Sequence, residues 1–285
     1  MKRFLNIYLL FIVLAASFTS CDMFPYTLED APIKTTKPAT MKSLPFSISN
    51  NSQVYFSSGN LQYNAYMGQW RFAPNQYDYV GEGNDNISSF YNGWIDLFGW
   101  GTGNNPSEYG AYDKYYSIYI DWGFNKIGND KPETWRTLTS VEWNFLINSR
   151  QNANLLKGAA CLLLDNGEEV FGWILLPDSW KSPSDITFKS GCTNGYSTNI
   201  IREVKWKSME AQGAIFLPAA GYREGSYSFN LNRDGRYWTS SVSNEADYEG
   251  APLFLNFTEN IFSSGYRYNK KSRYPGHSVR LVKDL

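Results

Sequence analysis

The chain has 285 residues, with 26 Lys and Arg against 27 Asp and Glu, so its formal net charge at pH 7 is −1. It contains no basic stripe, which argues against a nucleic-acid partner, because such a partner requires a positive footprint. Aromatic residues make up 17% of the chain, and Tyr is the most frequent of them. Because a Tyr ring has an apolar body and a polar tip, we expect some rings to line surface grooves rather than the core.

The N-terminus has the pattern of an export signal. Lys2 and Arg3 precede an apolar run, residues 4–16, that is too short to span a bilayer. With small residues after the run, this pattern indicates a secretory signal peptide over residues 1–20. The stretch FTSC ends at Cys21 and resembles a bacterial lipobox, with Phe18 where leucine is usual. It predicts that Cys21 is lipidated and anchors the protein to a membrane of the cell envelope, at the outer membrane or cell surface. The alternative is an ordinary signal peptide followed by an incidental cysteine.

Residues 21–45 carry this cysteine and a proline-rich polar segment without an apolar period. Chain of this kind is semi-extended, at about 3.1 Å per residue, and reaches up to roughly 75 Å. We therefore expect a tether, followed by one large domain over residues 46–285. After removal of the signal peptide, 24 basic and 27 acidic residues remain, a net charge of −3.

The first part of the domain combines short strands with a long irregular region. Residues 53–64 predict a strand, a Gly-Asn turn and a second strand, and residues 69–73 continue the pattern. Residues 81–130 show no helical or strand period, and a loop of that length is usually functional or packed on itself. Its stretch GEGNDNIS (81–88) offers four Asx and Glu side chains without the alternation of a calcium loop. We favour hydrogen-bonded turns there and expect no metal and no cofactor; the alternative is a cation bound by this loop.

A helix and a hairpin follow. Thr139 and Glu142 have the spacing of a capping box in the segment 134–150, whose Val141, Phe145 and Leu146 predict a buried stripe. Two apolar strands then flank residues 165–167, Asp-Asn-Gly, a strong hairpin signal.

Two cysteines remain beyond Cys21. Cys161 lies in an apolar run that predicts a strand, and Cys192 lies in a polar loop. An oxidising compartment would allow a disulfide between Cys161 and Cys192. The alternative is two separate small buried residues.

The last part of the chain reads as a short helix over residues 202–213, ended by Gly213, and four short strands. We place these strands at residues 214–223, 235–241, 251–257 and 277–282. No repeat of 20–50 residues occurs. The fold class predicted is α+β, with two capped helices and many short, mostly antiparallel strands.

Five stretches then carry a resemblance to a known family. They are WRTLTSVEW, GWILLPDSW, MEAQGAIFLPAAGYR, GRYWTSS and GHSVRLV, and they occur in that order. Together they resemble the Fibrobacter-type major paralogous domain of exported lipoproteins, which is similar to the formylglycine-generating-enzyme branch of the C-type lectin-like fold. The resemblance covers residues 53–282. It implies a twisted antiparallel sheet with two flanking helices, long irregular loops, and the two chain ends side by side.

The chemistry of the related proteins does not transfer. The copper-binding enzymes use two closely spaced cysteines near the C-terminus, whereas nothing after Cys192 is cysteine. The calcium-dependent lectin motifs are also missing, since the nearest string is Leu176-Pro177-Asp178 and leucine is no ligand. The only histidine, His277, precedes Ser278 in a predicted strand, where neighbours point to opposite faces, so the two cannot act as base and nucleophile.

These observations favour an exported, lipid-anchored, non-catalytic binding module, lectin-like or adhesin-like, for a glycan or protein partner. The alternatives are a structural subunit of a surface or pilus-like assembly, and an enzyme of unrecognised type. The resemblance places ligand binding on the loops between the late strands, here residues 177–185 and 221–238, which the fold should bring together. The expected binding residues are Asp178, Trp180, Tyr222, Arg223, Asn230, Asn232, Arg233 and Asp234. The alternative is that Trp180 and Tyr222 belong to the core and that residues 233–235 form a plain exposed turn.

Overall fold

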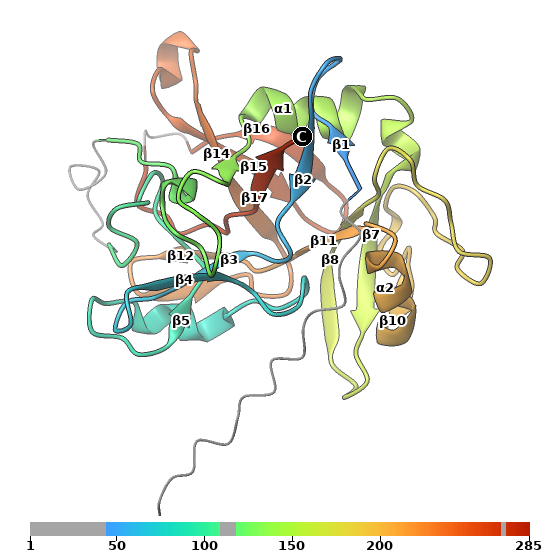
Figure 1. Ribbon diagram of the computed structural model, residues 1–285, viewed down its shortest axis with the longest axis horizontal. Helices are drawn as coiled ribbons and strands as arrows, with labels where there is room; N and C mark the ends of the chain where they lie inside the picture. Colours follow the sequence, from blue (N-terminus) through green and yellow to red (C-terminus); the bar gives the residue numbers. More distant parts are fainter. Residues whose placement is uncertain (1–43, 109–117, 269–271) are drawn as a thin grey trace, which may run out of the picture. The chain divides into compact units, whose positions relative to one another are not determined.

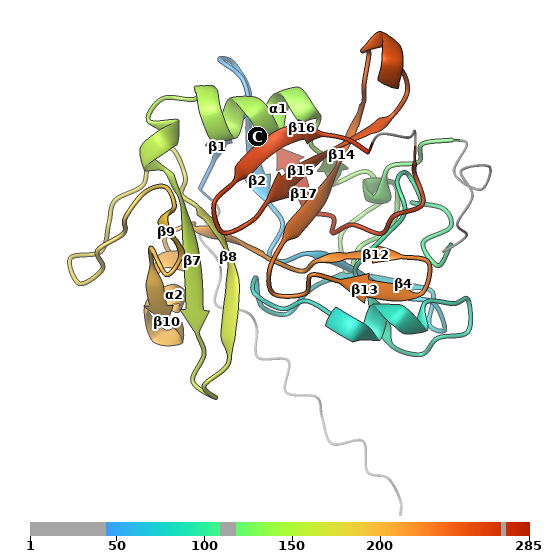
Figure 2. The ribbon, with the colours of Figure 1, turned by 180° about the vertical axis from the view of Figure 1, so that it is seen from behind.

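The computed structural model describes residues 44–108, 118–268 and 272–285. The signal peptide, the lipidation site Cys21 and the tether up to residue 43 lie outside these ranges. Short strands in five sheets and two short α-helices make up the described part, so the α+β class is confirmed (Figures 1 and 2). Among the described residues, no helix is both long and apolar enough to cross a membrane.

The two ends of the domain meet in one sheet. Strand β2 (Gln53–Phe56) pairs antiparallel with β17 (Leu281–Asp284), and β1 (Phe46–Ser47) and β6 (Arg136–Thr137) extend the sheet on either side. The expectation that the chain ends lie side by side is confirmed. The last strand, however, begins at Leu281 and not at His277, which forms only an isolated bridge to Phe98.

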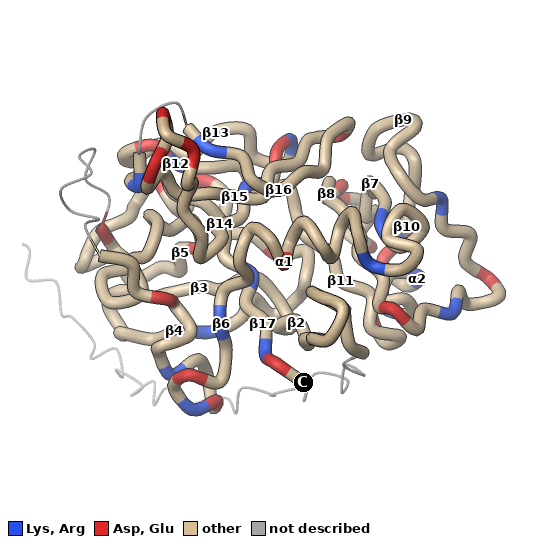
Figure 3. Tube along the Cα trace, turned by 90° about the horizontal axis from the view of Figure 1, so that it is seen from above, with Lys and Arg blue, Asp and Glu red and all other residues tan. Residues whose placement is uncertain are grey.

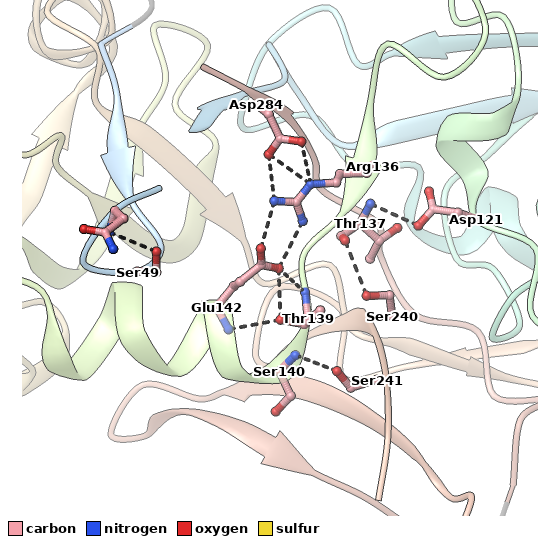
Figure 4. Close-up of polar contacts among 11 residues, drawn as sticks. Ser49, Asp121, Arg136, Thr137, Thr139, Ser140, Glu142, Ser240, Ser241 and Asp284 are labelled. Atoms are coloured by element: carbon pink, nitrogen blue, oxygen red, sulfur yellow. Dashed lines mark hydrogen bonds and ion pairs between the residues drawn. The ribbon is translucent and has the colours of Figure 1, made fainter. Parts of the chain in front are cut away.

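Arg136 ties this sheet to the first helix (Figure 4). Its guanidinium donates to both carboxylate oxygens of Glu142, at 3.0 and 2.8 Å, and to Asp284 of β17, at 2.8 and 3.0 Å. Glu142 also accepts from the backbone N of Thr139, at 2.7 Å, while its own backbone N donates to the Thr139 hydroxyl. The predicted capping box is therefore confirmed, and it is joined to the C-terminal strand through one arginine.

Helix α1 (Ser140–Asn144) continues as one π-helical turn, η4 (Phe145–Ser149), and lies against the late strands β15 and β16. Its buried side chains are Trp143, Leu146 and Ile147, which recur at helical spacing. The predicted stripe is therefore wrong for Val141, which is 77% exposed, because the inward positions of the helix are Ser140 and Trp143, on either side of it.

A four-stranded sheet holds the predicted hairpin. Its order is β10 (Ile200–Arg202), β7 (Lys157–Leu163), β8 (Glu169–Leu175) and β11 (Ile215–Pro218). Strands β7 and β8 pair antiparallel around the turn at residues 165–167. In that turn only Gly167 has a positive φ, 87°, so it is a three-residue loop with one left-handed position rather than a two-residue turn.

Helix α2 (Glu203–Glu210) lies beside this sheet, close to β7 and β10 in both views. Its apolar side chains Trp206 and Met209 are fully buried. Gly213 follows with φ 86° and donates to the carbonyl of Glu210 at 2.8 Å, so the predicted C-terminal glycine cap is confirmed.

The early strands divide between two sheets. Strand β2 belongs to the sheet that joins the two chain ends, the terminal sheet, whereas β3 (Leu61–Asn64) pairs with β4 (Gln69–Phe72) and β5 (Trp94–Ile95). The turn between β2 and β3 contains Gly59, where a Cβ atom would lie 2.6 Å from the carbonyl oxygen of Ala73. Both predicted strands form, but they do not pair with each other: β2 pairs with β17, and β3 pairs with β4 and β5.

The late strands form two small antiparallel sheets. One pairs β12 (Tyr222–Glu224) with β13 (Tyr227–Phe229), and the other orders β14 (Gly235–Val242), β15 (Pro252–Phe257) and β16 (Phe262–Tyr266). The remaining elements are short: β9 (Thr193–Tyr196), η1 (Gly81–Asn86), η3 (Trp122–Phe124), η5 (Ala153–Leu155) and η6 (Ala246–Tyr248).

Three hydrophobic clusters form the core. The first joins the terminal sheet to α1 and β8, the second packs β3–β5 against β14 and residues 279–281, and the third lies between the β7–β8 sheet and α2. The irregular region 81–130, whose residues 109–117 lie outside the described ranges, packs into the second cluster through Trp100 and Trp122. Charged residues of both signs are interspersed along the trace (Figure 3).

Candidate functional site

A pocket of about 250 Å³ opens where four separate segments converge. Strand β8 contributes Phe171, and the end of β9 contributes Tyr196. The turn before β14 contributes residues 232–234, and the turn between β15 and β16 contributes residues 258–260. Three of the eight predicted binding residues, Asn232, Arg233 and Asp234, therefore lie in one pocket.

An aromatic pair forms one wall of the pocket. The rings of Phe171 and Tyr196 stack with centroids 5.1 Å apart and planes 9° from parallel. The Tyr196 hydroxyl donates to the backbone carbonyl of Arg233 at 2.5 Å. Burial, then the nearby carboxylates of Asp234 and Glu259, raise the pKa of Tyr196, so this hydroxyl stays protonated and keeps its donor role.

Two asparagines shape the turn that carries Arg233. Asn230 and Asn232 have φ values of 53° and 55°, a left-handed conformation that asparagine tolerates better than most residues. Asn230 donates to the carboxylate of Asp234 at 2.6 Å. Asn232 accepts from the backbone N of Phe171 at 2.7 Å and donates to the carbonyl of Glu169 at 2.8 Å, which docks the turn onto β8. Both asparagines hold the turn in place, and the amide of Asn232 is already hydrogen-bonded to β8.

The rest of the lining is polar, and two of its charged side chains, Arg233 and Glu259, make few hydrogen bonds within the described residues. Arg233 is exposed, and the described residues give its guanidinium no hydrogen bond or ion pair. From the described part of the chain, the Glu259 carboxylate accepts one long bond, 3.3 Å, from the Asn260 amide. The pocket thus presents one guanidinium, the two carboxylates of Asp234 and Glu259, and an amide beside an aromatic wall. Such a set can bind hydroxyls, amides or a carboxylate.

Asp178 lies elsewhere and has a structural role. It accepts from the Arg150 guanidinium at 2.9 Å, from the backbone N and hydroxyl of Ser47 at 2.8 and 2.7 Å, and from Gln53 at 3.1 Å. It follows the far end of β8, a seven-residue strand that spans roughly 23 Å. Asn232 contacts the beginning of that strand. The expectation that residues 177–185 and 221–238 share a site is therefore wrong for Asp178.

Trp180, Tyr222 and Arg223 also fall outside the pocket. Trp180 packs against the third core cluster. Tyr222 stacks on Phe229 and lies under the Arg236 guanidinium, 3.5 Å from its ring centroid. Arg223 is fully buried and donates to the carbonyls of Gly225 and Leu97. Tyr222 and Arg223 are committed to packing within and beneath the β12–β13 hairpin, and Trp180 is committed to the third cluster.

The disulfide between Cys161 and Cys192 is not formed, and both residues are free cysteines. Gly191 bridges Gly158, which places Cys192 beside Ala159, whereas β10 lies beside Cys161. A two-residue offset along one strand and one step to its neighbour separate two Cα atoms by about 8 Å. A disulfide needs less than about 7 Å, so the register prevents it.

His277 is a structural residue and lies in the core. It is fully buried, stacks on Trp238 at 3.9 Å, and shares a hydrogen bond of 2.8 Å with the Tyr268 hydroxyl. Burial, then the guanidiniums of Arg236 and Arg223, lower its pKa well below the usual value, so the ring is neutral.

Residues 81–86 form the short helix η1, whose polar side chains make hydrogen bonds within the protein. Buried Asn84 donates to Asp96 at 2.8 Å and accepts from the backbone N of Asp96 and Leu97. Over residues 44–108, 118–268 and 272–285, no three His, Cys, Asp or Glu side chains gather in a way that could hold a metal ion.

Sequence reasoning missed Phe171, Tyr196 and the turn at residues 258–260. A usable signal was present, since Thr258-Glu259-Asn260 is a polar turn between two apolar strands. Nothing local, however, indicates that this turn faces residues 232–234. No family model, curated protein or solved structure was found to match this chain. Function must therefore be inferred from the pocket itself.

Proposed function

We propose that this chain is a non-catalytic binding module, held at the cell envelope by a lipid on Cys21, that binds a polar ligand, a glycan or a surface protein, in the pocket between Phe171 and Asn260. One observation carries the proposal. The uncommitted guanidinium of Arg233 converges with the carboxylates of Asp234 and Glu259 and the amide of Asn260 beside a stacked aromatic pair.

The chemistry of this lining suits a saccharide best. Aromatic side chains give a sugar an apolar contact surface, while carboxylates and amides accept and donate to its hydroxyls. A guanidinium makes paired hydrogen bonds to a carboxylate, so an acidic sugar would use Arg233 most fully. The pocket is small and open, which fits one or two rings at the end of a chain.

The proposal extends to the fold. We assign the domain to the C-type lectin-like fold and the chain to the paralogous-domain lipoproteins that its five sequence stretches resemble. Three features support this assignment: the pairing of β2 with β17 at the chain ends, the two flanking helices, and the long irregular region before α1. A ligand site between late strands agrees with it.

A glycan array tests the function. The full-length chain in non-ionic detergent should bind a subset of glycans, and Arg233→Ala should weaken that binding by about tenfold, since a hydrogen bond to a charged group contributes roughly 1.5 kcal/mol or more. Arg202→Ala, an exposed arginine on β10 away from the pocket, is the matched control. Array binding that is absent, or that Arg233→Ala leaves unchanged, would contradict the proposal.

A second candidate, a structural subunit of a surface assembly, is favoured by a separate observation. Phe90, Tyr66 and Met67 are 86%, 70% and 45% exposed, and the backbone N of Tyr66 donates to Tyr91, so these residues lie close together. Exposed apolar groups gathered at one place are typical of protein contacts. Stoichiometric co-purification with another envelope protein, abolished by Phe90→Ser but not by Arg233→Ala, would favour this candidate.

A further inference from the structure

A second pocket, of about 330 Å³, lies on the other face of β8 from the first. Val170 lines it, whereas its neighbour Phe171 lines the first pocket, and neighbours in a strand point to opposite faces. The tip of the β7–β8 hairpin contributes Leu164 and Glu168, and the chain after β4 contributes residues 77–81. The two pockets share no lining residue, so binding in the second pocket does not rest on the function proposed above.

Two tyrosines give this second pocket its apolar surface. Tyr77 and Tyr79 pack against the third core cluster and are half-buried, so their rings are held in place while part of each meets the pocket. The Tyr77 hydroxyl is fixed by donating to Glu203 of α2 at 3.1 Å. Val80, Leu164 and Val170 complete the apolar lining.

The pocket is also negatively charged. Asp78 and Glu168 line it, and no lysine or arginine is among its lining residues. Burial first, then the surrounding carboxylates, raise the pKa of both tyrosines: Glu203, Asp78 and Glu210 act on Tyr77, and Glu168 and Asp96 act on Tyr79.

The nearby cations are already engaged. Lys207 pairs with Glu203 at 2.6 Å. Arg71 lies over the Trp94 ring, 3.7 Å from its centroid, and donates to Gln62 at 2.9 Å, while its charge acts on Asp78. Glu168, by contrast, is exposed, and its carboxylate accepts one long bond, 3.4 Å, from Asn166. A positive ligand would therefore meet a carboxylate that no described cation neutralises.

We propose that this pocket binds an alkylammonium group, contacted by the rings of Tyr77 and Tyr79 and attracted by the carboxylates of Asp78 and Glu168. Aromatic faces and a nearby negative charge together favour an organic cation over a metal ion, which would need more oxygen ligands. The group belongs either to a small free ammonium compound or to a lysine side chain of a protein.

Saturation-transfer NMR on the full-length chain in non-ionic detergent tests this at millimolar ligand. The probes are choline, Nα-acetyl-lysine N-methylamide, and the uncharged choline analogue 3,3-dimethylbutan-1-ol. We expect at least one cation to give a signal about threefold or more above that of the neutral alcohol. Choline alone would identify a small quaternary ammonium compound as the source, and the lysine derivative alone would identify a protein side chain.

Two variants and one control localise the site. Glu168→Gln should weaken cation binding by about two- to fivefold, and Tyr79→Leu by a similar factor. Glu169→Gln makes the same change one residue later, on the opposite face of β8, and should leave binding unchanged. Because Glu168 is exposed, its variant tests the site even if Tyr79→Leu unfolds. Equal signals from the cations and the neutral alcohol, no effect of Glu168→Gln, or an equal effect of Glu169→Gln would overturn the proposal.

Discussion

Asp178 provides a sharp test of the structure, because the sequence suggests a ligand contact and the fold makes it a structural anchor. Its carboxylate is the ionic partner of Arg150, whose side chain is 1% exposed, whereas that of Asp178 is 26% exposed. The same carboxylate holds Ser47 of β1 and Gln53 of β2. Asp178→Ala therefore removes the counter-charge of a buried cation and two attachments of the N-terminal strands.

The expected loss follows from this geometry. Removing one partner of a buried ion pair costs about 3–5 kcal/mol, because the other charge stays buried and uncompensated. Arg150 keeps its hydrogen bonds to the carbonyls of Leu146, Leu156 and Leu176, and Asp178 is partly exposed, so the lower end applies. A loss of about 3 kcal/mol lowers Tm by roughly 6–12 °C in a domain of this size.

Differential scanning calorimetry of the full-length chain in detergent measures this shift. Asp185→Ala is the control, since Asp185 forms its ion pair with Lys205 at an exposed position and its loss should leave Tm nearly unchanged. Replacing Arg150 by Met in the Asp178→Ala background should recover part of the loss, because no buried charge then remains.

The pH dependence gives a second check. Burial acts to raise the pKa of Asp178, but the hydrogen bonds from Ser47, Arg150 and Gln53 outweigh it and hold the pKa below its usual value. A carboxyl group with a lowered pKa stabilises the fold above its unfolded pKa of about 3.9, and that contribution is lost as the pH falls through the folded value. The Tm difference between wild type and Asp178→Ala should be constant above about pH 5 and shrink below pH 4. A shift no larger than that of Asp185→Ala, or one independent of pH, would refute the structural role.

Further predictions concern the cap, the thiols, the loop and the lipid. Thr139→Ala removes the hydroxyl that accepts from the Glu142 backbone and should cost about 1 kcal/mol, read as a fall in Tm. Both Cys161 and Cys192 should react with a thiol reagent in denaturant without reductant, and a blocked pair would mean that the strand register is wrong. EDTA should leave Tm unchanged, because Asn84 and Asp96 close the 81–88 stretch with their own hydrogen bonds; a clear fall would indicate a bound cation. Cys21→Ala should abolish lipid processing and detergent partitioning, as mass spectrometry and phase separation would reveal.

The candidate site could be predicted only in part. The turn at residues 232–234 was found because its Asn, Arg and Asp side chains mark an exposed polar loop. Its companions Phe171 and Tyr196 are ordinary strand aromatics, and only the stacking of β8 against the end of β9 turns them into a wall. Asp178 and Trp180 have the same residue types as a sugar site, but one pairs with a buried arginine and the other packs on a core.

The helix caps and the turns could be predicted from the sequence alone, because these depend on interactions between neighbouring residues. The capping box at Thr139, the hairpin at residues 165–167 and the glycine cap at Gly213 all depend on residues within a few positions of one another. The α+β class follows from the types of the short elements along the chain. Which strands share a sheet was decided by tertiary contacts. Strand β2 pairs with β17 from the other end of the chain while β3 pairs with β4 and β5, and the pairing of Gly158 with Gly191 keeps Cys161 and Cys192 apart. These outcomes depend on contacts between segments far apart in the chain, whose free energy no local pattern encodes.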